Sequence, residues 1–281
     1  GDLSVDFRAS DGTEIDGEVT LPPGFDPTRK DPLIVYYYGG TSPSDHSINH
    51  PYNPNVFASR DYVEYVINPS GTTGYGQEFS ARHVNAWGKR TADDIIEGVK
   101  LFCRQHPYVD AKKIGCLGAS YGGFSVYWLA GHNDGRFAAL IAHAGIFNVE
   151  AQYCETEEMW FADFDLGGAP WDKNNAVAQR TYSNSPHLFV DKWTAPILIT
   201  VGERDYRILA SQGMMAFNSA KMHGLDAQML VFPDENHWIL KPQNAILWQR
   251  VFFNFLDKHL KNAAPAKNKP DETTSSDSIN Q

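Results

Sequence analysis

The sequence predicts an α/β fold, built around a mostly parallel sheet of about eight strands with helices on both faces. Two observations carry this prediction. Short apolar runs alternate with longer segments of helical periodicity, and this alternation is typical of parallel sheets covered by helices. Hydrophobic residues make up 42% of the 281 residues, which is enough for one large core. We therefore expect one domain over residues 1–262 and a disordered, polar tail over residues 263–281.

The first half of the chain is expected to form four strands and one helix. An antiparallel pair is predicted at residues 3–7 and 14–21, on either side of Asp11-Gly12. Apolar strands follow at residues 33–37 and 63–67, separated by a polar loop from residue 41 to about residue 55. Residues 92–105 are predicted to be helical, because apolar residues recur there at helical spacing: Ile95, Ile96, Val99 and Phe102.

The second half alternates strand and helix more regularly. Strands are expected at residues 112–117, 138–142, 196–201 and 228–232. One helix is expected to begin at Gly122 or Gly123, a second to span residues 210–222 and a third to span residues 243–260. The last helix is expected to turn five apolar side chains inward: Ile246, Leu247, Phe252, Phe253 and Leu256.

Charge and composition exclude several classes of protein. The formal net charge is −10 and there is no basic stripe, so a nucleic-acid partner is not expected. No apolar run reaches about 18 residues, so no membrane span is expected. The three cysteines, Cys103, Cys116 and Cys154, are too few for a disulfide framework and are interpreted as inert.

A glycine-flanked serine carries the first chemical signal. Ser120 lies in Gly118-Ala119-Ser120-Tyr121-Gly122, between a predicted strand and a predicted helix. The G-x-S-x-G pattern presents a serine hydroxyl on a tight strand-to-helix turn, where it can act as a nucleophile. A serine in an ordinary glycine-rich turn is the alternative, so the residues later in the chain have to decide.

An acid and a histidine follow at the ends of later strands. Asp205 lies in the loop after the strand at residues 196–201, and His237 lies in the loop after the strand at residues 228–232. The order Ser120, Asp205, His237 is that of the catalytic triad of α/β-hydrolases. Two rival acids are near, Asp234 and Glu203, but Asp234 stands only three residues from His237 and is better suited to shaping the turn.

Each member of this triad has a chemical role. A neutral histidine at position 237 can accept the Ser120 proton and return it to the leaving group, and Asp205 would fix the tautomer of its ring. The oxyanion needs preorganised donors, one of which is the backbone N–H of Tyr121. A second donor is expected from the loop that follows Tyr38-Gly39-Gly40. This chemistry requires no cofactor, and the grouping of Asp45, His46 and His50 in a proline-containing loop does not indicate a metal site.

The motifs together resemble the prolyl oligopeptidase family of serine peptidases, most closely its acylaminoacyl-peptidase and dipeptidyl-peptidase V branch. The resemblance runs from about Asp11 to Leu260. It rests on four stretches: Gly118-Ala119-Ser120-Tyr121-Gly122-Gly123, Tyr38-Gly39-Gly40, Asn68-Pro69-Ser70-Gly71-Thr72-Thr73-Gly74-Tyr75-Gly76 and Asp234-Glu235-Asn236-His237-Trp238.

The resemblance implies further site residues. It places Tyr38 at the position of the second oxyanion donor. It places Arg207 and Ile208 at positions that hold a substrate carbonyl and line the pocket for the residue before the scissile bond. Three residues are weaker candidates for the same pocket wall: Ile146, Val149 and Tyr153.

The resemblance also implies partners and a function. Members of the family usually carry a β-propeller before the hydrolase domain, and this chain lacks one, so we expect either the catalytic part of a longer chain or a stand-alone hydrolase. The expected substrate is a short peptide, cleaved through an acyl-enzyme with dipeptidyl or acylaminoacyl release. An ester hydrolase with the same triad and a non-catalytic binding domain remain the alternatives. A periplasmic or secreted location is implied, with the cytoplasm as alternative, and the resemblance is compatible with a homo-oligomer.

Overall fold

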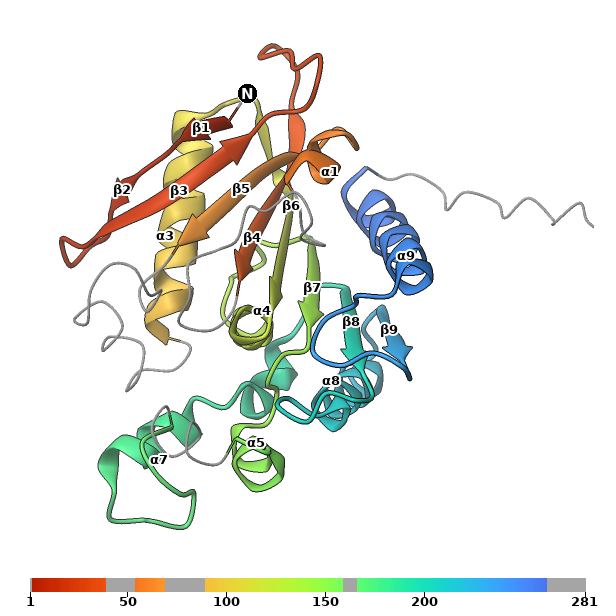
Figure 1. The fold of residues 1–281 in the computed structure, drawn as a ribbon. Coiled ribbons are helices and arrows are strands. Elements are labelled where there is room, and N and C mark those ends of the chain that lie inside the picture. Colours follow the sequence, from red (N-terminus) through yellow and green to blue (C-terminus); the bar gives the residue numbers. More distant parts are fainter. Residues whose placement is uncertain (1, 39–53, 69–88, 159–165, 262–281) are drawn as a thin grey trace, which may run out of the picture.

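A computed structural model of the chain describes residues 2–38, 54–68, 89–158 and 166–261 (Figure 1). Nine strands in these ranges form one sheet. They are β1 (Asp2–Ser4), β2 (Phe7–Arg8), β3 (Glu14–Thr20), β4 (Asp31–Tyr38), β5 (Val63–Asn68), β6 (Val109–Ala119), β7 (Ala139–His143), β8 (Ile197–Gly202) and β9 (Ala227–Phe232).

The sheet is mostly parallel. Its order is β1-β3-β5-β4-β6-β7-β8-β9, and β2 pairs with β3 beside this path. All pairs from β5 to β9 are parallel, whereas β3 is antiparallel to β1, β2 and β5. The predicted α/β fold with about eight strands is therefore confirmed. The predicted first strand is divided into β1 and β2, both of which pair with β3.

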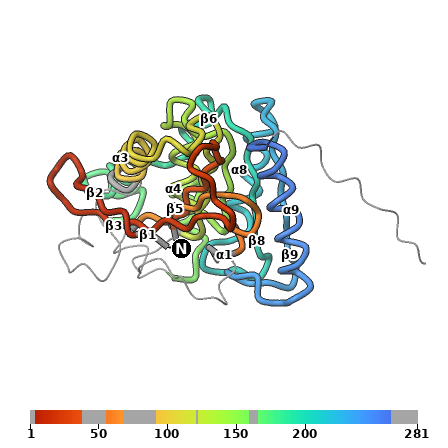
Figure 2. The backbone as a smooth tube through the Cα atoms, turned by 90° about the horizontal axis from the view of Figure 1, so that it is seen from above, coloured from red at the N-terminus to blue at the C-terminus, as the bar shows by residue number. Residues whose placement is uncertain are grey.

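Helices cover both faces of the sheet. Helices α3, α4 and α8 pack on one face, and α1 and α9 pack on the other, so that strands lie between α3 and α9 (Figure 2). Within the described ranges, the helices are α1 (Pro54–Ala58), α3 (Lys89–Gln105), α4 (Tyr121–Ala130), α5 (Val149–Glu155), α7 (Ala176–Ser183), α8 (Ala210–Met222) and α9 (Pro242–Leu260), together with a 3₁₀ helix, η1 (Pro186–Lys192).

The buried parts of the central strands are largely apolar because both of their faces are covered, as in the second half of β6, which is fully buried. Along β4, Leu33, Val35 and Tyr37 point to the face covered by α3 and α4, whereas Ile34 and Tyr36 point to the face covered by α9. Cys116 on β6 is buried, and burial raises the pKa of its thiol to about 12. A thiol with so high a pKa stays protonated and unreactive, as the sequence predicts for this residue.

The inward face of α9 differs from the prediction at one residue. Ile246 is 69% exposed, whereas Trp248, Phe252, Phe255, Leu256 and Leu260 are buried. Phe253 is buried as well, although it lies only about 20° from Ile246 around the helix axis, seven residues further along α9. Ile246 lies near the start of α9, where the residues before Trp248 are exposed or only partly buried, so its exposure reflects its position along the helix rather than its side of the helix.

Among the described residues between β7 and β8, three short helices escape prediction: α5, α7 and η1. Their lengths of seven or eight residues are too short for a clear apolar period. Two of them have a local start signal. The side chain of Asn148 accepts a hydrogen bond from Ala151 N at 3.2 Å, and that of Asn175 accepts one from Ala178 N at 3.1 Å. Asparagine is a favoured N-cap, so both helices begin where the sequence offers one.

Candidate active site

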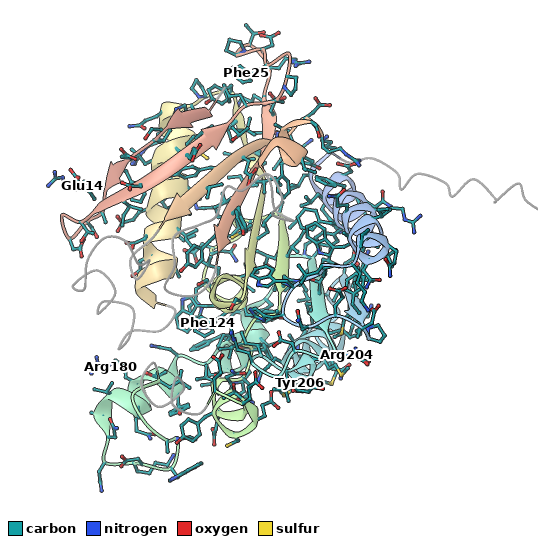
Figure 3. All side chains as sticks on the ribbon, in the orientation of Figure 1. Glu14, Phe25, Phe124, Arg180, Arg204 and Tyr206 are labelled. Carbon is teal, nitrogen blue, oxygen red and sulfur yellow. The ribbon has the colours of Figure 1, made fainter. Side chains whose placement is uncertain are left out.

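Ser120 occupies a strained turn between β6 and α4. Its backbone has φ 59° and ψ −116°, a conformation that is rare for a residue with a side chain. Two hydrogen bonds hold this turn: Ser120 N donates to His143 O at 2.9 Å, and Phe124 N donates to Ser120 O at 3.1 Å. Phe124, labelled in Figure 3, is fully buried and anchors the first turn of α4 in the core. The predicted strand–turn–helix setting of Ser120 is confirmed.

Close backbone contacts explain why glycines flank Ser120. A Cβ at Gly122 would overlap the carbonyl oxygen of Tyr37, and one at Gly118 would overlap the backbone of Gly122. The start of α4 therefore lies directly against the ends of β4 and β6, which leaves no room for a side chain at either position.

We expect Gly122→Ala to destabilise the fold and to reduce activity together. The new methyl group has to displace the Tyr37 carbonyl, and overpacking of this kind costs about 1–3 kcal/mol. Denaturant unfolding measures that cost. Gly115→Ala, on β6, is the matched control, because a Cβ there would meet the ends of side chains and no backbone, the nearest being Leu260 and Ile34 at 3.1 and 3.2 Å. Equal losses of stability in the two variants would contradict this account of the turn.

Asp205 and His237 are paired directly. The distance between Asp205 Oδ2 and His237 Nδ1 is 2.5 Å. The Asp205 side chain is 2% exposed and that of His237 is 12% exposed, so the pair is largely screened from water. Asp205 follows β8 and His237 follows β9, and these strands are parallel neighbours. Their loops therefore meet at the same edge of the sheet as Ser120, which follows β6.

The second oxygen of Asp205 is also occupied. Oδ1 accepts hydrogen bonds from the backbone N–H groups of Arg207 and Ile208, each at 3.0 Å. Because an ionised carboxylate only accepts, Oδ2 receives the proton of His237 Nδ1–H. Nε2 of His237 is then the nitrogen that can accept a proton. Arg204 and Tyr206, labelled in Figure 3, flank Asp205 and are both exposed.

Neither rival acid is paired with His237. Asp234 accepts hydrogen bonds from Lys241 Nζ at 2.8 Å and from Asn244 Nδ2 at 2.9 Å, and the bond from Lys241 is the main cause that lowers its pKa. Glu203 is exposed. Asp234 thus ties the loop after β9 to the start of α9, which is the turn-shaping role expected from its position.

Glu235 supports the histidine loop and was missed as a functional residue. Its carboxylate is buried and accepts from Leu240 N at 2.5 Å and Lys241 N at 3.0 Å. Its carbonyl accepts from Arg204 N at 3.0 Å, in the loop that carries Asp205. The loops after β8 and β9 are therefore held together by the residue two places before His237. The sequence does not reveal this role of Glu235, because the role depends on backbone partners that only the folded chain brings to the carboxylate.

The two oxyanion candidates, Tyr38 and Tyr121, are placed next to Ser120 by the strand pairing and by the chain, respectively. Tyr38 is the last residue of β4 and is in register with Ala119, the residue before Ser120. Tyr121 begins α4. The first N–H groups of a helix have no partner within the helix, so the N–H of Tyr121 is available to a bound oxyanion.

Four of the pocket candidates belong to one buried cluster. Ile146, Val149, Tyr153 and Ile208 are all less than 7% exposed. Helix α5, which carries Val149 and Tyr153, is joined to the loop after β8, because Gln152 Nε2 donates to Arg207 O at 2.8 Å. Val149 is completely buried, so it can shape a pocket only through the residues that cover it.

Arg207, the fifth pocket candidate, is the exposed one. Its side chain is 54% exposed, and its Nε donates to Glu158 Oε1 at 2.9 Å. Its backbone is held more firmly than its side chain. Thr156 Oγ1 donates to the Arg207 carbonyl at 2.8 Å, so this carbonyl accepts bonds from both Thr156 and Gln152.

Some predicted features lie outside the described residues. These are the residues 39–53, which include Gly39, Gly40, Asp45, His46 and His50, and most of the motif that begins at Asn68. The tail at residues 263–281 also lies outside them. Among the residues that the structure does describe, no three His, Cys, Asp or Glu side chains gather as metal ligands. None of the described helices has both the length and the apolar character needed to cross a membrane.

Proteins of known sequence place this geometry in context. The family model of the prolyl oligopeptidase family matches residues 48–263. A dipeptidyl-peptidase 5 from Porphyromonas endodontalis is 50% identical over 265 residues, covering 93% of this chain and 38% of that protein. A dipeptidyl-peptidase 5 from Schizosaccharomyces pombe is 36% identical over 257 residues, covering 91% of this chain and 37% of that protein. The chain thus spans a little over a third of the length of these curated relatives.

Solved structures agree on the fold. The uncomplexed acylaminoacyl peptidase of Pyrococcus horikoshii superposes with a TM-score of 0.82 at 26% identity, over 92% of this chain and 42% of that one. An acylaminoacyl peptidase in complex with Z-Gly-Gly-Phe-chloromethyl ketone superposes with a TM-score of 0.83 at 25% identity, over 94% of this chain and 42% of that one. With its α/β-hydrolase sheet, its strained serine turn and a family match over most of its length, the chain belongs to the prolyl oligopeptidase family.

Proposed function

We propose that the chain is the catalytic part of a serine peptidase that releases dipeptides from short peptides. The observation that carries this proposal is the 2.5 Å bond between Asp205 and His237, at the sheet edge where the strained Ser120 turn also lies. The dipeptidyl-peptidase 5 relatives support dipeptide release in particular, since one of them shares half of the residues.

The reaction follows from the protonation states of the pair. Ser120 Oγ attacks the scissile carbonyl and gives its proton to His237 Nε2, while Asp205 holds the other ring nitrogen. The backbone N–H of Tyr121 and the main chain or side chain of Tyr38 stabilise the oxyanion. His237 then returns the proton to the leaving amine. Water repeats the sequence on the acyl-enzyme and releases the dipeptide.

The pocket candidates take secondary roles in this proposal. Arg207 has an exposed guanidinium that can reach a substrate carbonyl at modest cost, because its present partner, Glu158, is itself partly exposed. Ile208 and Tyr153 supply apolar surface close to the acid loop, and Ile146 and Val149 pack with them in the same cluster.

Three substrate types test the proposed function: a dipeptidyl nitroanilide with a free amino terminus, an N-acylated aminoacyl nitroanilide and a short acyl nitrophenyl ester. We expect the largest kcat/KM for the dipeptidyl substrate. A preference for the N-acylated substrate would replace dipeptidyl by acylaminoacyl release. Ester cleavage without amide cleavage would instead indicate a carboxylic ester hydrolase. A chain that neither cleaves any of them nor reacts with a fluorophosphonate would be a binding domain.

A further inference from the structure

His143 lies between the strands that carry the nucleophile and the acid. It is the last residue of β7, the strand between β6 and β8. In the sheet register it is paired with Ala119 on one side and with Thr200 on the other. Its side chain is buried, with the residue 1% exposed. A histidine buried at this edge of the sheet is therefore surrounded by the elements of the active site rather than by solvent.

The main chain of His143 holds the serine turn. Its carbonyl oxygen accepts the hydrogen bond of Ser120 N at 2.9 Å. The next residue, Ala144, has φ 46°, which is rarely adopted by alanine. A Cβ at Gly123, in the first turn of α4, would lie 2.9 Å from the same carbonyl. The His143 carbonyl is thus fixed in a tightly packed position against the start of the nucleophile helix.

The side chain of His143 holds the histidine loop. Nε2 lies 2.9 Å from the carbonyl oxygen of His237, and Nδ1 lies 2.6 Å from Thr200 Oγ1. A carbonyl oxygen only accepts hydrogen bonds, so Nε2 must carry a proton. In the neutral ring Nδ1 is then an acceptor, and the Thr200 hydroxyl is its donor. Both ring nitrogens are satisfied in one orientation and in one tautomer.

Aromatic contacts fix the plane of the ring. Trp238 stacks on His143, with a centroid distance of 5.6 Å and an interplanar angle of 20°. Trp238 also meets the His237 ring edge to face, at 5.4 Å and 73°. The His143 ring therefore contacts the backbone of His237 directly, and it contacts the His237 ring through the Trp238 side chain that lies against both.

We infer that His143 is a positioning residue, which sets the distance between Ser120 and His237 by binding the backbone of both. This inference rests on the proposed function, in which those two residues exchange a proton. Catalysis is sensitive to such positioning, because a displacement of about 1 Å in a catalytic group can cost about 100-fold in rate.

The test compares two replacements of His143 in the 281-residue chain. His143→Leu removes the donor to the His237 carbonyl, whereas His143→Gln keeps an N–H at the same number of bonds from the backbone. We expect the leucine variant to lose about 10- to 100-fold in kcat with KM changed less than about threefold, and fluorophosphonate labelling to slow equally. We expect the glutamine variant to recover kcat to within about fivefold of the unchanged chain.

His106→Leu is the matched control, because His106 also binds a backbone carbonyl through its ring and stacks on an aromatic residue, Phe102, but does so at the end of α3. Its kcat should not change. A spectroscopic measurement complements the kinetics. Long-range ¹H–¹⁵N correlation spectra should show the His143 ring with its proton on Nε2 alone.

Some results would overturn the inference. These are an equal loss of kcat in the glutamine and leucine variants, full kcat in the leucine variant, or a His143 proton on Nδ1. If the leucine variant does not fold, the glutamine variant and the spectrum still decide, since a loss above tenfold with glutamine counts against it. Failure of the proposed function is distinguishable, because the unchanged chain would then cleave no peptide, whereas the labelling rate and the tautomer stay measurable.

Discussion

Replacement of Ser120 by alanine is expected to lower kcat for peptide substrates by about 10⁶-fold. The remaining rate would come from substrate binding and the oxyanion donors without a nucleophile. The reason is chemical, because the acyl-enzyme cannot form without the hydroxyl group. Alanine fits the turn sterically almost as serine does, so the fold should be retained. Hydrolysis of a dipeptidyl nitroanilide and labelling by a fluorophosphonate both measure the loss.

Ser125→Ala is the control for this variant. Ser125 is also in α4, is 1% exposed, and its Oγ has no hydrogen-bond partner within the part of the chain that the structure describes. Loss of that hydroxyl should leave kcat and labelling as they are. Peptide cleavage that survives Ser120→Ala would mean that another group is the nucleophile.

Asp205→Asn is expected to lower kcat by about 10⁴-fold with little change in KM. The asparagine oxygen can still accept from the backbone N–H groups of Arg207 and Ile208, so the loop should keep its shape. The amide nitrogen then faces His237 Nδ1 and donates to it. This favours the tautomer with its proton on Nε2, which cannot accept the proton of Ser120.

Asp234→Asn separates this effect from a general loss of negative charge in the same loops. Asp234 is bound to Lys241 and Asn244, away from the pair, so its neutralisation should leave kcat within about twofold. Thermal unfolding of both variants checks that the fold persists. If Asp234→Asn were the more damaging change, the assignment of Asp205 as the acid would be wrong.

The sequence predicts the long elements well because their apolar patterns are unambiguous. Helix α8 has the predicted bounds, Ala210–Met222, and the strands from β4 to β9 appear where buried apolar runs are found. Ile246 shows the limit of pattern reading. It lies on the same side of α9 as the buried Phe253, yet it is 69% exposed, because the first turns of α9, before Trp248, are not covered by the core.

The sequence by itself determined the order Ser120, Asp205, His237 and the placement of each at a strand end, because these features depend on local pattern and chain order. The tertiary structure adds the contacts of the two acids, because the sequence can favour Asp205 over Asp234 but does not show which carboxylate touches His237. The deciding facts are the 2.5 Å contact of Asp205 and the capture of Asp234 by Lys241.

His143 is the clearest case of a residue that only the tertiary structure could assign. His143 is the last residue of β7, and several other strands of the sheet also end beside the triad loops, but no sequence motif distinguishes His143 from them. Its partners Ser120, Thr200 and His237 are 23 to 94 residues away in the chain. They meet only because β6, β7 and β8 are neighbours in the sheet and the loop after β9 folds back over them. Hydrogen bonds between distant segments depend on that packing, which sequence periodicity does not record.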